Sequence, residues 1–388
     1  MEAPTTGFVP PPYPHDRLTA LRRLADAMPG GVVDCSVGTP VDPMPEVAVR
    51  ALVDAAGGAT GYPPSTGTPA LREAAAAWIG RRFGVEVDAD GVIACVGTKE
   101  LVASLPQVLH LRNPTRDTVL FPAIAYPTYE MGARLAGLRP VPVPLDTDWH
   151  PDLDRVAPDD ADRALLLWLN DPGNPTGASM GAERVASVVA WARERGIVVS
   201  GDECYAEFTA HADGTPADPT TVLQSGLDGV LAVHSLSKRS NMAGLRAGFV
   251  AGDPDLVRYL GEVRKHAGLM VAAPVQAAAT AALGDDTHVA VQRSRYAERR
   301  ALVLDALGAH GIVHDGGPST FYLWLRGDAG MDDGWELAAR FADAGTLVAP
   351  GDLYGPAGAD HVRLSLTQPL DRLELLVERI DASAARAS

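Results

Sequence analysis

The sequence is poor in the residues and patterns that mark several classes of protein. Only three cysteines occur in 388 residues, Cys35, Cys95 and Cys204, and none lies in a CxxC motif or beside paired histidines. Neither a disulfide scaffold nor a metal site is therefore predicted. No run of about 18 apolar residues occurs, and the first residues lack a basic and apolar leader, so we expect a cytoplasmic protein without a membrane segment.

Positive charge is also scarce. Lysine and arginine number 33 against 49 aspartates and glutamates, which gives a net charge of −16. Broad contact with nucleic acid or an anionic membrane needs clustered basic residues, so neither partner is expected. The hydrophobic share of 46% and the charged share of 21% are those of an ordinary folded chain, and 388 residues suffice for two domains.

The pattern of apolar residues predicts a doubly wound α/β domain and a smaller α+β domain. A proline-rich arm is followed by helices within residues 16–31, 37–56 and 68–84. Short apolar runs then alternate with helical stretches from residue 92 to 252, which is typical of a mostly parallel sheet. The predicted buried strands are 118–122, 164–170, 196–203, 229–235 and 247–252. We expect an arm and part of the small domain in residues 1–45, the large α/β domain in 46–270 and the small α+β domain in 271–388.

Polar residues follow the predicted strands of the large domain. Asn174 follows one strand, Asp202 and Tyr205 follow the next, and "SLSK", which ends at Lys238, follows a third. The carboxyl ends of parallel strands collect ligands, so these side chains are expected at one site. A fourth segment, "VGTKE", places Gly97 at the amino terminus of a helix, where backbone N–H groups favour an anion.

Each of these residues also has a plain structural interpretation. Lys238 could be a solvated turn lysine, Asp202 a helix cap, Asn174 a turn residue and Gly97 only a turn. Together, however, Lys238 with Ser235, Ser237 and Arg246 supplies an amine and three groups suited to a phosphate. A single bound molecule carrying an aldehyde and a phosphate would use all of them.

At this point the motifs resemble a known family. "YPPSTGTPALR", "NPTG", "DECY", "SLSK", "GLR" and "VRLSL" occur in the order found in the fold-type I, class I/II pyridoxal-phosphate aminotransferases. Asp202 lies 28 residues after Asn174 and 36 before Lys238, and Arg246 and Arg363 lie 8 and 125 residues after Lys238. The resemblance covers nearly the whole chain. It implies pyridoxal 5'-phosphate as the cofactor and amino acids and 2-oxo acids as substrates.

The resemblance also implies roles for the residues that react. Lys238 would form the covalent link to the cofactor's aldehyde and then move the proton between the substrate α-carbon and the cofactor. Asp202 would pair with the pyridine nitrogen and keep it protonated. Asn174 and Tyr205 would hydrogen-bond the ring's phenolic oxygen, and Tyr126 would stack on the ring unless it is an ordinary packed tyrosine.

The remaining implied roles concern the phosphate and the substrate. Gly97, Thr98, Lys99, Ser235, Ser237 and Arg246 would surround the phosphate, completed by Tyr62 of a neighbouring subunit in a homodimer. Arg363 would bind the substrate α-carboxylate beside Gly38. Tyr62 could instead pack on the surface, and Arg363 could form a structural ion pair.

The substrate is predicted from a narrower resemblance. "VGTKE" and "HSLSKRSNMAGLRAGF" look like the actinobacterial-type N-succinyldiaminopimelate aminotransferases of lysine synthesis, which transfer the amino group of glutamate to N-succinyl-2-amino-6-oxopimelate. Lys99 and Arg239 are extra cations, and we expect at least one to contact a distal carboxylate, although either could be a solvated charge. The alternatives are an aminotransferase for aspartate, alanine or an aromatic amino acid, a carbon–sulfur β-lyase, and a non-enzymatic ligand-sensing domain of a transcription regulator.

Overall fold

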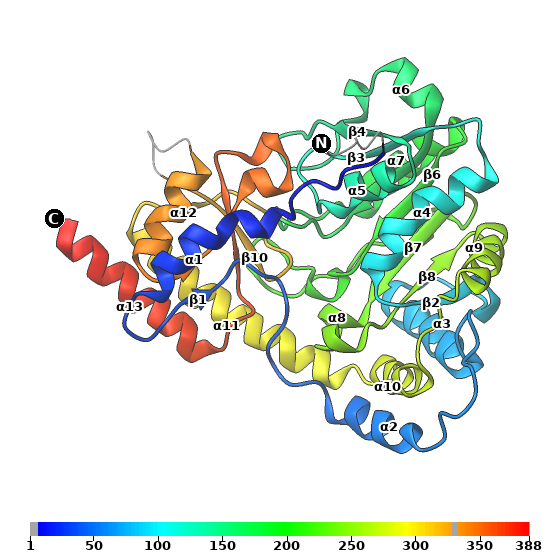
Figure 1. Cartoon of the computed structure of the whole chain (residues 1–388), viewed down its shortest axis with the longest axis horizontal. Helices are drawn as coiled ribbons and strands as arrows, with labels where there is room; N and C mark the ends of the chain where they lie inside the picture. Colours follow the sequence, from blue (N-terminus) through cyan, green and yellow to red (C-terminus); the bar gives the residue numbers. More distant parts are fainter. Residues whose placement is uncertain (1–6, 328–332, 388) are drawn as a thin grey trace, which may run out of the picture.

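The chain folds into a larger body around a seven-stranded sheet and a smaller body around a four-stranded sheet. The computed structural model describes residues 7–327 and 333–387. In Figure 1 the larger body lies on the right and the smaller body on the left, and the long helix α11 runs from one to the other. The predicted fold class, an α/β body with a smaller α+β unit, is confirmed.

The large sheet is mostly parallel, as predicted. Its strand order is β2-β8-β7-β6-β5-β3-β4, and only β8 runs antiparallel to its neighbours. The strands are β2 Val92–Cys95, β3 Thr118–Pro122, β4 Arg139–Val143, β5 Ala164–Asn170, β6 Val198–Asp202, β7 Val230–Ser235 and β8 Gly248–Gly252. The periodicity did not predict β4, because Pro140 and Pro142 interrupt it. Prolines at alternate positions suit an edge strand, since one side of that strand needs no N–H donors.

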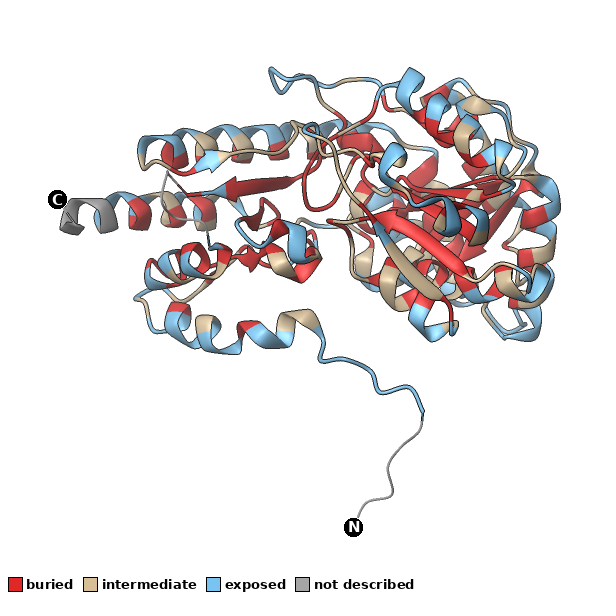
Figure 2. Ribbon diagram, turned by 90° about the horizontal axis from the view of Figure 1, so that it is seen from above, coloured by how far each residue is buried: buried red, intermediate tan, exposed pale blue. Residues whose placement is uncertain are grey.

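The central strands are buried on both faces, which explains their nearly continuous apolar sequences. In β5, Leu166 and Trp168 belong to one hydrophobic cluster, whereas Leu167 and Leu169 belong to another. Successive side chains of a strand point to opposite faces, so the two clusters are the two sides of the sheet. In Figure 2 these strands are almost entirely buried.

Helices cover both faces of the large sheet. One cluster contains residues of α4 and α5 with α9, and the other contains residues of α3, α7 and α10. The helices of this body are α2 Glu46–Ala56, α3 Pro69–Phe83, α4 Thr98–Arg112, α5 Thr128–Leu135, α6 Pro158–Arg163, α7 Ala182–Glu194, α8 Leu236–Arg239, α9 Pro254–His266 and α10 Ala273–Leu283. Among the described residues, no helix combines the length and apolar character that crossing a bilayer requires.

The smaller body combines both ends of the chain. Its antiparallel sheet has the order β12-β13-β10-β9, and β1 pairs with β11 beside it. The strands are β1 Val33–Asp34, β9 Val313–His314, β10 Tyr322–Arg326, β11 Thr346–Leu347, β12 Ala349–Pro350 and β13 Val362–Ser365. Helices α1 Thr19–Asp26, α11 Thr287–Ala309, α12 Gly334–Asp343 and α13 Leu370–Ala387 surround them.

The packing of α10 differs from the predicted division of the chain. The sequence assigns residues 271–388 to the small domain, but α10 packs against α2 and α3 of the larger body. Ala278 and Leu283 of α10 belong to the hydrophobic cluster of the large sheet. The change from one body to the other therefore falls between α10 and α11, at Asp285 and Asp286.

Candidate active site

A cavity of about 260 Å³ lies at the carboxyl ends of the parallel strands, between the two bodies. The larger body contributes residues that follow β5, β6 and β7, and the smaller body contributes residues of β10 and β13. Twelve of the fifteen residues predicted for the site line this cavity, namely Gly38, Thr98, Lys99, Tyr126, Asn174, Asp202, Tyr205, Ser235, Ser237, Lys238, Arg246 and Arg363. Convergence of strand ends explains how residues far apart in sequence meet here.

Lys238 presents an amine to this cavity from the short helix α8. The helix begins directly after β7, and its N-cap, Ser235, accepts a hydrogen bond from the backbone N–H of Ser237 at 3.1 Å. The Nζ atom of Lys238 donates to the backbone oxygen of Gly38. A side chain at Gly38 would overlap the phenol of Tyr322, so only glycine fits at that position.

An anion cradle lies beside the amine. Gly97 is the N-cap of the 15-residue helix α4 and has a φ of +71°, a conformation that favours glycine. A Cβ atom on Gly97 would overlap the guanidinium of Arg246, whose Nη1 donates a hydrogen bond to the Ala243 carbonyl at 2.9 Å. Free N–H groups at a helix amino terminus, a guanidinium and the hydroxyls of Ser235 and Ser237 together fit a phosphate.

Asp202 provides a buried carboxylate at the end of β6. Its Oδ2 accepts a hydrogen bond from the Tyr129 hydroxyl at 2.8 Å, and its Oδ1 accepts a longer one from the Cys204 backbone at 3.4 Å. Burial raises the pKa of Asp202 above its ordinary value, although hydrogen bonds from Cys204 and Tyr129 and the charge of Lys238 act in the opposite direction. A cationic N–H donor in the cavity would stabilise the ionised carboxylate.

Arg363 lies between aromatic rings on the opposite wall. Its Nη2 donates to the Ser36 carbonyl at 2.6 Å, and its Nη1 donates to Oδ1 of Asn174 at 2.9 Å. The guanidinium carbon lies 4.2 Å from the ring centre of Tyr322 and 4.8 Å from that of Tyr354. Its buried Nε has no hydrogen-bond partner among the described residues. A carboxylate entering the cavity could satisfy this guanidinium.

Lys99 lies near the amino-terminal arm at the cavity wall. Its Nζ donates to the hydroxyl of Tyr13 at 3.3 Å and lies 4.9 Å from the centre of the same ring. His15 also lines the cavity, and burial together with the charge of Arg363 lowers the pKa of His15. Asp202 is the only acidic residue lining the cavity in the described part of the chain, so this wall carries uncompensated positive charge.

The sequence did not identify several residues of the site. Asn170 is the last residue of β5, and its side chain bonds both the Asp202 carbonyl, at 2.8 Å, and the Asn174 backbone, at 2.7 Å. Its place at a strand end was a usable signal. Tyr322 and Tyr354 come from the small body, and the Tyr322 hydroxyl lies 3.0 Å from that of Tyr205. No local pattern links these two tyrosines to the predicted strand ends.

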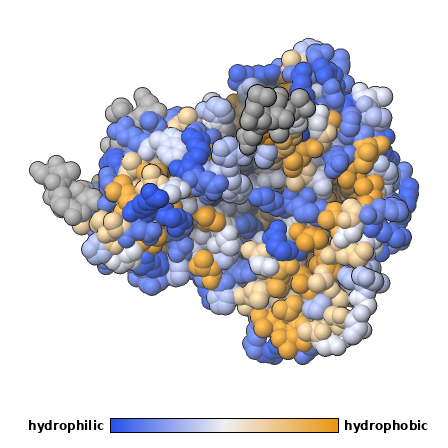
Figure 3. Space-filling view, viewed as in Figure 1, coloured by the Kyte–Doolittle hydropathy of each residue, from blue (hydrophilic) through white to orange (hydrophobic). Residues whose placement is uncertain are grey.

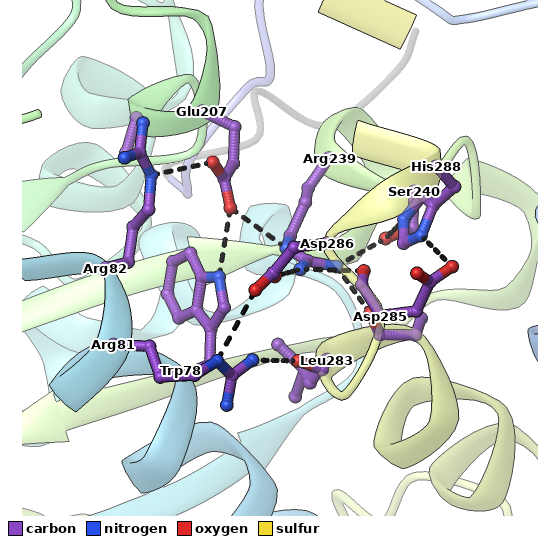
Figure 4. A network of polar contacts seen from close by, with 12 residues as sticks. Trp78, Arg81, Arg82, Glu207, Arg239, Ser240, Leu283, Asp285, Asp286 and His288 are labelled. Carbon is purple, nitrogen blue, oxygen red and sulfur yellow. Dashed lines mark hydrogen bonds and ion pairs between the residues drawn. The ribbon is translucent and has the colours of Figure 1, made fainter. Parts of the chain in front are cut away.

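The prediction that Arg239 contacts substrate is wrong. Arg239 follows Lys238 but points away from the cavity, and its side chain is 4% exposed. Its nitrogens bond Glu207, Asp286, Ser240 and the carbonyls of Ala282 and Asp285, as Figure 4 shows for this network. Every nitrogen of the guanidinium therefore has a protein partner, and none is left for a ligand.

Neither Tyr62 nor Gly97 lines this cavity, and the described residues do not form a metal site. Tyr62 is 97% exposed and lies outside the cavity of this chain. Gly97 forms the cradle through its backbone and is not itself among the lining residues. Within the described ranges, no group of three or more histidine, cysteine or acidic side chains has the arrangement of a metal site.

Known proteins resemble this chain along almost its whole length. The family model described as aminotransferase class I and II matches residues 31–380. A probable aminotransferase of Mycobacterium tuberculosis is 46% identical, over 97% of this chain and 88% of that protein. The 4-dedimethylamino-4-oxo-anhydrotetracycline transaminase of Streptomyces rimosus is also 46% identical, over 97% and 98%. The solved structure of a probable N-succinyldiaminopimelate aminotransferase from Thermus thermophilus superposes with a TM-score of 0.85 at 31% identity, covering 95% of this chain and 99% of that one.

Proposed function

Because the chain belongs to the class I and II aminotransferases, whose members use pyridoxal phosphate, we propose that it transfers the amino group of L-glutamate to N-succinyl-2-amino-6-oxopimelate. The products would be N-succinyl-LL-2,6-diaminopimelate and 2-oxoglutarate, an exchange that belongs to lysine and diaminopimelate synthesis. The cytoplasm is the proposed location, which rests on the sequence alone.

The cavity residues fit the cofactor group by group. The cradle of Gly97, Thr98, Ser235, Ser237 and Arg246 would hold the phosphate, and a Cβ atom at Gly97 would fill part of it. Asp202 would pair with the pyridine nitrogen, and Lys238 would hold the aldehyde. Asn174 and Tyr205 would bond the phenolic oxygen, and Tyr126 would stack on the ring. Bound pyridoxal phosphate supplies an electron-withdrawing ring that stabilises negative charge at the substrate α-carbon.

The chain's own residues would perform binding and proton transfer. Arg363 would orient the substrate through its α-carboxylate, with Tyr322 and Tyr354 packed on the guanidinium. Lys238 Nζ would take the proton from the substrate α-carbon and pass it to the cofactor, and it would reverse this transfer for the second substrate. Asp202 would keep the proton on the pyridine nitrogen, because an ionised carboxylate stabilises a neighbouring cation.

One observation carries the choice of substrate, which is that Lys99, predicted to lie beside the phosphate, bonds Tyr13 of the amino-terminal arm instead of a charged partner. In the cavity, Arg246 would serve the phosphate, Lys238 the aldehyde and Arg363 the α-carboxylate, while the amine of Lys99 bonds the hydroxyl of Tyr13 and lies over its ring. An additional cation in a cavity with a single acidic residue favours a substrate with a further carboxylate. The relative from Thermus thermophilus, named for a succinylated substrate, supports the same choice.

A panel of amino acceptors tests this proposal. Purified protein loaded with pyridoxal phosphate is given glutamate and either the succinylated oxo acid or the 2-oxo acids of aspartate, alanine and aromatic amino acids. The proposal predicts the largest kcat/KM for the succinylated acid. Preferred turnover of another oxo acid, or release of pyruvate and ammonia from a sulfur amino acid, would contradict it and favour another aminotransferase or a β-lyase.

Substitution of Lys99 examines the same point within the protein. Lys99→Ala should lower kcat/KM about tenfold for the succinylated acid, the value of one charged hydrogen bond, and less than twofold for an unsuccinylated one. Lys265→Ala is the matched control, since Lys265 lies exposed on α9. Equal losses of kcat/KM on both substrates would show that Lys99 does not bind a distal carboxylate.

The homodimer is part of the proposal. Val47, Val49 and Val53 of α2 are exposed, and Figure 3 shows hydrophobic residues gathered over α2 and α10 at the bottom of the view. A second copy covering this surface could bring its Tyr62 to the phosphate cradle. Light scattering should give twice the chain mass, and Val53→Asp should shift the protein toward monomer and weaken cofactor binding. A monomeric parent protein with full cofactor affinity would contradict this part.

A further inference from the structure

Arg239 and Glu207 form a buried ion pair beside the cavity. Each lies close in sequence to a residue that is proposed to react or to bind the cofactor. Arg239 directly follows Lys238, and Glu207 lies two residues after Tyr205. The Nε of Arg239 donates to Oε1 of Glu207 at 3.2 Å, and the two side chains are only 4% and 6% exposed. The segment with the amine and the segment with the carboxylate and phenol are thus joined directly.

Helix α8 has little rigidity of its own. It spans four residues, Leu236–Arg239, so it forms a single turn. One turn fixes many dihedral angles for very few hydrogen bonds of its own, so its orientation must come from contacts with the rest of the chain. The backbone of Leu236 makes two of these, to the Ala247 carbonyl and from the Met242 N–H, each at 3.2 Å. Among the side chains of α8, that of Arg239 makes the most hydrogen bonds, so the position of Lys238 depends on its neighbour.

Both members of the pair are also held by other elements. Glu207 accepts hydrogen bonds from Nε1 of Trp78 and Nε of Arg82 on α3, each at 2.9 Å. Arg239 donates to the Ala282 carbonyl at 2.6 Å and to Oδ1 of Asp286 at 2.9 Å. Figure 4 shows these side chains converging around the guanidinium. The pair is therefore anchored to α3 on one side and to the end of α10 on the other.

The same network reaches the junction between the two bodies. Asp285 and Asp286 immediately precede α11, which continues into the small body. His288 on α11 lies 2.9 Å from the Ser240 hydroxyl and 3.0 Å from Asp285. Arg239 and Ser240, the two residues after Lys238, are thus both attached to the start of the connecting helix.

We propose that Arg239 and Glu207 are positioning residues that fix the amine of Lys238 relative to Asp202, Tyr205 and the root of α11. The proposal rests on the function proposed above, because that function gives Lys238 its reaction. Lysine could not replace Arg239, since one ammonium offers three donors from a single point, whereas the guanidinium spans partners on three elements. Displacing a reacting group by about 1 Å can cost about 100-fold in rate.

The test uses cofactor-loaded protein and begins with three single variants. Arg239→Lys keeps the charge but loses the fork, Glu207→Gln keeps the shape but loses the charge, and Arg81→Gln is the control. Arg81 belongs to the same network through the Leu283 carbonyl and Asp286, but it has no bond to α8. Thermal unfolding is recorded for each, so that only folded protein is compared.

Three readouts separate positioning from general support of the fold. Arg239→Lys and Glu207→Gln should lower kcat at least tenfold, with KM for glutamate changed less than threefold. The midpoint of the pH titration of the visible absorption band should move in both variants, because the band reports the surroundings of the bound aldehyde. Arg81→Gln should match the parent in kcat and in the midpoint. The double variant Arg239→Gln/Glu207→Gln, which removes both charges, should not recover the parental midpoint.

The opposite results would overturn the proposal. Parental kcat and an unmoved midpoint in Arg239→Lys would show that the pair does not position the amine, as would equal changes in Arg81→Gln. Lys238→Ala distinguishes this failure from failure of the proposed function. If Lys238→Ala keeps the parental spectrum and turnover, the proposed function is wrong; if it loses both while Arg239→Lys keeps both, only the positioning role is wrong.

Discussion

Lys238 and Arg239 are adjacent in one turn of helix, yet they belong to two very different regions. Lys238 faces a cavity in which Arg246 bonds a single carbonyl and Arg363 keeps one buried nitrogen unpaired among the described residues. Arg239 faces a network in which each nitrogen of its own guanidinium is bonded and two carboxylates compensate its charge. Buried polar groups are normally satisfied, so the unsatisfied region indicates ligand binding and the satisfied region indicates structural support.

The largest expected effect removes the amine from the unsatisfied region. Lys238→Ala should reduce transamination by at least about 1000-fold, since it removes the group that moves the proton. The free energy of unfolding of the cofactor-free protein should change little, because the one hydrogen bond of the Lys238 side chain within the described part of the chain goes to the Gly38 carbonyl. Steady-state assays and urea unfolding measure the two quantities. Turnover within tenfold of the parent would mean that Lys238 is not the reacting amine and that the cavity differs from the network in no functional way.

Arg363 offers the next largest change. Arg363→Lys should lower kcat/KM for glutamate about 100-fold, or about 3 kcal/mol, because a lysine cannot form the paired contact or stack between Tyr322 and Tyr354. The dissociation constant for pyridoxal phosphate should stay within threefold of the parent. A variant that binds glutamate normally but loses the cofactor would mean that Arg363 serves the cofactor instead.

Gly97 tests the cradle itself. Gly97→Ala places a methyl group on the Arg246 guanidinium and in a backbone conformation, with a φ of +71° and a ψ of 149°, that costs about 1–3 kcal/mol for other residues. We expect the dissociation constant for pyridoxal phosphate to rise at least about tenfold, measured by fluorescence titration of the cofactor-free protein. Gly31→Ala, also at a φ of +70° but with open space around it, is the control for backbone strain. Equal weakening in both variants would argue against the cradle.

The smallest effect concerns the pH dependence of stability in the cofactor-free protein. Burial raises the pKa of Asp202, so its favourable contribution is complete below its ordinary pKa of about 4 and is lost as the pH rises through the raised value. Asp202→Asn should therefore make the free energy of unfolding fall less steeply from about pH 4 upward. Urea unfolding at several pH values measures the slope. Identical slopes would mean that Asp202 is not an uncompensated carboxylate.

The sequence predicted the cavity better than the network, and geometry explains why. Asn174, Asp202 and Ser235 could be brought together because parallel strands end at one edge of a sheet. The direction of the Arg239 side chain could not be predicted in this way. Successive residues of a helix point about 100° apart, so adjacency to Lys238 did not place Arg239 in the cavity. Tyr322 and Tyr354 were missed because they come from the small body, more than 80 residues further along the chain.

Chemical trapping of the cofactor tests the central claim most directly. The chain has only three lysines, Lys99, Lys238 and Lys265, so the site of attachment can be assigned without ambiguity. Protein loaded with pyridoxal phosphate is reduced with borohydride, digested and mapped by mass spectrometry. The account predicts the cofactor on the peptide containing Lys238. Attachment to Lys99 or Lys265 instead, or no attachment in protein that transaminates, would contradict it.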